Sequence, residues 1–126
     1  MDKFFLIAIG GALGSAARWG VQMLLNPLSQ KWHFPMGTLA VNCVGCFCIG
    51  LTAGLLATRW ASLPDAYRLA ITVGVLGGFT TFSSYGLDTV GLAEQGFPWR
   101  AAGNVLASNA LGFLLVFMGD KLVRGV

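Results

Sequence analysis

A stretch of glycine, hydroxyl and aromatic residues, Gly77–Tyr85, interrupts a hydrophobic segment that is long enough to cross a membrane. Each of its two leading glycines weakens a helix by about 1 kcal/mol relative to alanine. The hydroxyl side chains that follow offer the backbone alternative hydrogen-bond partners. In lipid, an interrupted helix is tolerated only where protein buries it or where it borders a polar cavity. The stretch therefore predicts a functional site inside a membrane.

The rest of the chain also indicates an all-α integral membrane protein. Of its 126 residues, 56% are hydrophobic and 10% are charged. A spanning helix needs about 20 apolar residues. Four blocks reach that length: Phe4–Leu25, Met36–Ala57, Tyr67–Leu92 and Ala101–Leu122. We expect a single four-helix membrane domain over residues 1–126, multi-pass in the plasma membrane or a cell inner membrane, with the third helix interrupted.

The ends of the blocks carry the expected signals. The dipeptide Asn26-Pro27 is predicted to end the first helix, because proline lacks an N–H and clashes with the preceding turn. The first block lacks a strongly basic start and a convincing cleavage site. We therefore expect it to remain as a span and not to be removed as a signal peptide.

The basic residues favour one side of the predicted bundle only weakly, by five against two or three. Lysine and arginine near span ends set orientation. One side holds Lys3, Arg59, Arg68, Lys121 and Arg124. The other holds Lys31 and Arg100, with Arg18 toward that end of the first span. This weak bias permits insertion in both directions, and single scattered charges do not indicate nucleic-acid binding.

Small residues four positions apart recur in the blocks and predict close helix packing. They are Gly10 and Gly14, Gly50 and Gly54, Gly74 and Gly78, and Ser108 and Gly112. Gly77 and Gly78 are set apart as part of the break, because hydroxyls and aromatics follow them directly. The three cysteines, Cys43, Cys46 and Cys48, are interpreted as small apolar packing residues, since the chain lacks the further ligands of a zinc site.

Polar side chains share helix faces within three of the spans. Residues four apart lie on one face of a helix. The pairs are Thr38 with Asn42, Thr80 with Ser84, and Asn104 with Ser108. Phe79, Phe82 and Tyr85 form an aromatic stripe beside the hydroxyls. Any one pair is most simply helix–helix contact, but three together favour a polar track through the bundle.

The chemistry of this track excludes several classes of protein. No span contains a Ser-His pair, a metal cluster or a phosphate-binding loop, so we do not expect an enzyme. The middle of the track also lacks the carboxylate that a proton-coupled transporter usually needs, because Asp88 lies toward the end of its span. What remains are neutral donors and aromatic ring edges, which carry positive potential. This set suits a small anion.

Three motifs in order resemble the Fluc (CrcB) fluoride channels of microbes. They are Gly10-Gly11-Ala12-Leu13-Gly14 with Arg18-Trp19, Gly37-Thr38-Leu39 with Asn42, and Gly77-Gly78-Phe79-Thr80-Thr81-Phe82-Ser83. The similarity covers essentially the whole chain. It implies an antiparallel, dual-topology homodimer with two fluoride pores and with the third helix broken at the midplane. The implied partners are fluoride, membrane lipid and a second copy of the chain.

The resemblance also implies roles for individual residues. The carbonyls of Gly77 and Thr80 from each subunit would hold a structural Na+ at the dimer interface. Arg18 and Asp88 would be vestibule or structural charges, Asp88 standing where the family usually has glutamate. Tyr85 departs from the family, which usually has phenylalanine there, and Phe79 is the ring that could be confused with the pore pair. The implied fluoride pathway comprises Asn42, Thr38, Phe82, Tyr85, Ser83, Ser84, Ser108, Asn109 and Phe79.

The expected function is passive export of cytoplasmic fluoride, which confers fluoride resistance. One alternative is a small dual-topology multidrug exporter, but such exporters need a glutamate in the first span, where this chain has only Arg18. The other is a structural membrane subunit without transport activity, whose packing glycines would look the same.

Overall fold

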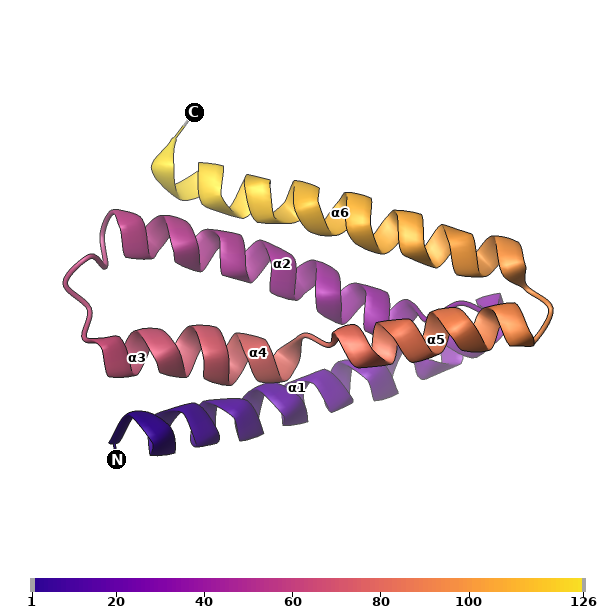
Figure 1. Cartoon of the computed structure of the whole chain (residues 1–126), viewed down its shortest axis with the longest axis horizontal. Coiled ribbons are helices and arrows are strands. Elements are labelled where there is room, and N and C mark those ends of the chain that lie inside the picture. The colour runs from indigo at the N-terminus through magenta and orange to yellow at the C-terminus, as the bar shows by residue number, and fades with distance from the viewer. Residues whose placement is uncertain (1, 126) are drawn as a thin grey trace.

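The structure, a computed structural model, describes residues 2–125 and contains helices and no strand over that range. Three long helices are α1 (Asp2–Trp32), α2 (Met36–Ala57) and α6 (Pro98–Arg124). The predicted third span is a row of four shorter pieces: α3 (Asp65–Leu69), the π-helix η1 (Ala70–Leu76), α4 (Gly77–Phe79) and α5 (Phe82–Glu94). These four rods form an antiparallel bundle with both ends of the chain at the same side, and the link between α4 and α5 is unwound (Figure 1). The all-helical fold and the broken third segment are thus confirmed.

Three of the four rods, α1, α2 and α6, are single helices long and apolar enough to cross a membrane. The prediction that Asn26-Pro27 ends the first helix is wrong, since Pro27 lies inside α1. A proline removes one backbone hydrogen bond, and α1 continues past it for another turn. The chain reverses instead after Trp32, where His33 adopts a positive φ of 47°.

Helices α2 and α6 lie side by side (Figure 1). The contact is between backbones: a Cβ built on Gly50 would collide with the Val116 carbonyl, and one on Gly119 with the Phe47 carbonyl. Small residues allow such close approach, which gains dispersion contacts where lipid provides no hydrophobic driving force between helices. The packing role predicted for Gly50 and Gly54 is confirmed.

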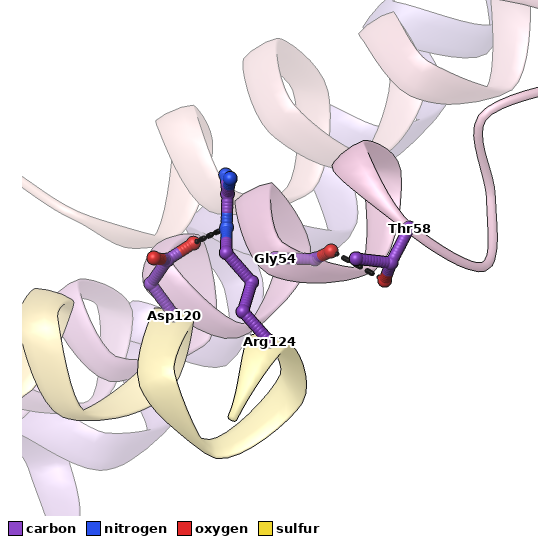
Figure 2. A network of polar contacts seen from close by, with 4 residues as sticks. All are labelled: Gly54, Thr58, Asp120 and Arg124. Carbon is purple, nitrogen blue, oxygen red and sulfur yellow. Dashed lines mark hydrogen bonds and ion pairs between the residues drawn. The ribbon is translucent and has the colours of Figure 1, made fainter. Parts of the chain in front are cut away.

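The end of this contact near the C-terminus carries two local polar contacts (Figure 2). The Thr58 hydroxyl donates to the Gly54 carbonyl at 2.8 Å. Arg124 Nε donates to Asp120 Oδ1 at 2.6 Å, one turn apart on α6. Both contacts join residues four positions apart in the sequence, so neither crosses between α2 and α6. The glycine contact therefore holds the two helices together.

Helix α1 packs in the same way against the third rod. A Cβ on Gly10 would lie 2.7 Å from the Ala70 carbonyl, and one on Gly78 would lie 2.6 Å from the Gly11 carbonyl. The packing role predicted for Gly74 and Gly78 is therefore confirmed, and Gly78 serves it although it also belongs to the stretch that leads into the break. Gly77 has helical angles, φ −65° and ψ −37°, and Gly78 is a packing glycine whose missing side chain lets α1 approach the third rod.

Candidate anion site at the broken helix

The break falls at two threonines, just after the double glycine. Thr80 has φ −80° and ψ 157°, and Thr81 has φ −151° and ψ 118°. Extended angles suit β-branched side chains. The Thr80 hydroxyl donates back to the Leu76 carbonyl at 3.0 Å, while Thr81 caps α5 by accepting the Ser84 N–H at 3.1 Å. The prediction that Thr80 and Ser84 share a helix face is therefore wrong, because the helix ends between them.

Asn42 of α2 holds the break in place. Its Oδ1 accepts the Thr81 N–H at 2.9 Å, and its Nδ2 donates to the Thr81 carbonyl at 3.0 Å. One amide side chain thus satisfies both backbone groups of a residue that has left the helix. Buried backbone groups without partners cost about 1–3 kcal/mol each, so this pair of bonds makes the interrupted backbone tolerable in the bundle.

Two carbonyls at the break lose their regular helical donors. The Thr81 N–H, four residues after Gly77, goes to Asn42. The Ser84 N–H, four residues after Thr80, goes to the Thr81 hydroxyl. In the described part of the chain no other backbone N–H replaces them. Gly77 and Thr80 are the residues that the resemblance assigns to Na+, a hard cation that prefers oxygen ligands, so the donor set fits such an ion.

A groove of about 410 Å³ opens beside the break. Its polar lining includes Asn42, Thr80, Thr81, Tyr85, Ser108 and Asn109. Ile49, Phe113 and Val116 form much of the apolar wall. Phe82 also borders the groove, with 83% of its surface exposed, and its ring centroid lies 5.5 Å from that of Tyr85. No acidic or basic side chain lines this groove.

A hydrogen-bond network joins α5 to α6 beside the groove. Asn104, only 1% exposed, donates to the Thr89 hydroxyl at 2.8 Å and accepts from Ser108 at 3.3 Å. Asn109 donates to Tyr85 Oη at 3.3 Å. The face predicted for Asn104 and Ser108 is confirmed, and it turns toward α5.

Other predicted site residues lie away from the groove. Thr38 is buried and donates to Asp88 at 2.7 Å. Asp88 borders a second cavity of about 450 Å³, next to the loop that contains His33. Arg18 is half-buried on α1 and borders neither cavity. The polar residues therefore form two clusters in the subunit, where a single track was predicted.

Three more of the predicted residues also stay outside the groove lining. Ser83 and Ser84 face the Thr81 hydroxyl, at 3.3 and 3.1 Å. Phe79 precedes the break and packs toward Gly45 of α2. The break separates Phe79 from Phe82 and Tyr85, so the continuous aromatic stripe predicted from their spacing is wrong.

The sequence prediction missed several residues of these clusters. Gln22 donates to Thr38 at 3.5 Å, Thr89 links Asn104 to α5, and Thr72 and Cys46 border the groove. Gln22 and Thr89 could have been found, because each is a polar residue inside a hydrophobic block. Cys46 had no such signal. The three cysteines are free, and the described residues contain no cluster of metal-ligating side chains.

Comparison with known proteins shows the family to which the chain belongs. The sequence profile of the CrcB-like protein family (Camphor Resistance, CrcB) matches residues 5–120. The chain is 40% identical over 124 residues to a "Fluoride-specific ion channel FluC" of Methylobacillus flagellatus, covering 98% of this chain and 96% of that protein. It is 46% identical over 123 residues to the protein of the same name from Paracoccus denitrificans, covering 98% and 95% of the two chains.

A third relative extends the similarity to the whole chain. A protein named "Fluoride-specific ion channel FluC" from Parabacteroides distasonis is 45% identical over 132 aligned positions, covering 100% of this chain and 96% of that one. The broken rod and Asn42 both lie within residues 5–120, the range that the family profile matches. The chain belongs to the CrcB family.

Proposed function

We propose that this protein is a fluoride-selective channel of the cell membrane, multi-pass and in bacteria in the inner membrane, that exports fluoride passively. The observation that carries the proposal is the groove beside the broken helix, which offers amide, hydroxyl and ring-edge donors and contains no carboxylate. The relatives are named for fluoride-specific conduction. The protein is a transporter of an ion and not an enzyme.

The chemistry of the groove favours a small anion over a cation. Neutral N–H and O–H donors can replace part of an anion's hydration shell, and the positive edge of an exposed ring such as Phe82 adds to the attraction. A membrane potential that is negative inside drives an anion outward with about 2.3 kcal/mol per charge per 100 mV. No coupled ion is required. A proton-coupled multidrug exporter would instead need a titratable carboxylate facing the groove.

The open groove supports assembly with a second copy of the chain. In a single subunit the groove is open, Phe82 is exposed, and the carbonyls of Gly77 and Thr80 lack helical donors. An antiparallel homodimer would cover the groove and bring these carbonyls together with those of the partner. Bound Na+ would add positive charge that raises the local potential for anions. The weak charge bias of the sequence is compatible with such dual topology.

Fluoride efflux from liposomes tests the function directly. Vesicles loaded with potassium fluoride and containing the purified protein are expected to release fluoride rapidly when valinomycin carries K+ out alongside the anion. The rate is measured with a fluoride electrode, and the same vesicles loaded with potassium chloride are followed with a chloride electrode. Chloride efflux as fast as fluoride efflux would refute selectivity, and no efflux of either ion would refute the channel.

Cross-linking in detergent and in liposomes tests the homodimer. The wild-type protein and the variant Phe4→Ala, which alters another strongly exposed ring, near the N-terminus, are both expected to give dimers. Phe82→Asp is expected to reduce the dimer fraction, because it places a charge where a partner would cover the ring. Monomers alone for the wild type would contradict both the two-pore arrangement and the shared Na+ site.

A further inference from the structure

The hydrogen bonds of the groove decide which side chains can still donate a proton to an anion. A hydroxyl carries one proton and an amide NH2 carries two. A proton already donated inside the subunit reaches an anion only if that bond breaks. The number of free protons is therefore a better guide to the anion ligands than the number of polar residues.

Most hydroxyls of the groove already donate their proton in a hydrogen bond within the subunit. Thr72 and Thr80 donate to carbonyls one turn earlier at 2.8 and 3.0 Å. Thr81 donates to Ser84 Oγ at 3.1 Å, and Ser108 donates to Asn104 at 3.3 Å. With their protons engaged, these four hydroxyls have only oxygen lone pairs left to offer, and lone pairs do not attract an anion. Their protons are unavailable while the subunit keeps its internal bonds.

The two asparagine amides and the tyrosine hydroxyl differ in how many protons they keep free. Asn109 Nδ2 donates to the Val105 carbonyl at 2.8 Å and to Tyr85 Oη at 3.3 Å, so both of its protons are engaged. Asn42 Nδ2 donates one proton to the Thr81 carbonyl and keeps its second proton free. Tyr85 Oη receives a proton from Asn109, and no acceptor within the described residues takes its own O–H. Among the described amides and hydroxyls that line the groove, Asn42 and Tyr85 thus hold the free protons.

We propose that Tyr85 is a direct anion ligand of the groove through its O–H, and that Asn109 is a positioning residue that orients this hydroxyl. The proposal rests on the proposed fluoride conduction. Because the Asn109 amide occupies a lone pair of Oη, the tyrosine is held as a donor toward the open side of the groove. Its ring lies 5.5 Å from that of Phe82, so hydroxyl and ring edge act on the same ion. Compared with the phenylalanine that is usual at this position, the tyrosine hydroxyl thereby adds one hydrogen bond to the anion.

The test is the fluoride dependence of the initial efflux rate from liposomes. Tyr85→Phe is expected to raise the half-saturating fluoride concentration about tenfold, equivalent to about 1.4 kcal/mol. Asn109→Leu is expected to raise it less, and the double variant no more than Tyr85→Phe alone, because the two residues act through one hydroxyl. Tyr67→Phe removes the other tyrosine hydroxyl of the chain, outside the groove, and is expected to match the wild type.

Dimer content and melting temperature in detergent separate binding from a structural role. If Tyr85→Phe lowers both but leaves half-saturation equal to that of Tyr67→Phe, the hydroxyl only braces α5 against α6 and the proposal is overturned. Equal half-saturation with unchanged stability overturns it as well, while fluoride conduction stands. If the effects of Tyr85→Phe and Asn109→Leu on half-saturation add up in the double variant, the positioning role of Asn109 is overturned. A wild type without fluoride efflux would instead refute the channel function itself.

Discussion

Replacing Asn42 by alanine is expected to lower fluoride efflux at least about 100-fold. The change removes the free amide proton from the groove and leaves the Thr81 N–H and carbonyl without the bonds that hold them at 2.9 and 3.0 Å. Hydrogen bonds to charged groups are worth about 1.5–3 kcal/mol, and each unsatisfied backbone group costs about 1–3 kcal/mol. Loss of an anion ligand and loosening of the break therefore act in the same direction. Fluoride-electrode traces from liposomes measure the effect.

Two further variants separate conduction from folding. Asn42→Asp keeps an acceptor for the Thr81 N–H but adds a negative charge to the groove, so we expect a dimer that does not conduct fluoride. Asn26→Ala changes an exposed asparagine of α1 and is expected to conduct like the wild type. Normal efflux through a dimeric Asn42→Ala would favour the alternative of a structural subunit in which the groove carries no ion.

Replacing Gly119 by alanine is expected to destabilise the folded subunit by about 3 kcal/mol or more. The added Cβ would meet the Phe47 carbonyl and would lie 2.7 Å from the Leu51 nitrogen. These are backbone atoms that cannot rotate away, so α2 and α6 must separate along their contact. Overpacking of a rigid interior typically costs about 1–3 kcal/mol, and here the main helix pair of the bundle is affected. Thermal unfolding in detergent, followed by circular dichroism, measures the loss.

The same helix offers a matched control. Gly103 lies on α6 with nothing within 4 Å of a built Cβ. Gly103→Ala is therefore expected to leave stability unchanged or to raise it slightly, since alanine favours a helix by about 1 kcal/mol over glycine. Equal melting temperatures for the two variants would show that the α2–α6 contact is looser than the structure indicates.

Some features of the fold follow from local sequence alone. Four hydrophobic blocks predict helices, because a backbone in lipid must satisfy its own hydrogen bonds. The hydroxyl run after Gly77-Gly78 predicts a break, because those side chains compete for the backbone. Both predictions concern groups that are close along the chain, and both are confirmed. The prediction for Asn26-Pro27 failed because one missing hydrogen bond near the end of a long helix does not stop it.

The site was predicted only in part. Asn42, Phe82, Tyr85, Ser108 and Asn109 border the groove as expected. Thr38 does not, because its hydroxyl turns to Asp88, a residue 50 positions away in the sequence. No pattern along one helix reveals such a partner.

What the sequence by itself determined is the class of the protein: a helical membrane bundle with an interrupted third segment and the motifs of its family. What only the tertiary structure decided is the role of each polar group. Asn42 clamps Thr81, and Asn109 gives its protons to Val105 and Tyr85. The physical reason is that each proton can be donated once, and its acceptor depends on which helices cross at that point.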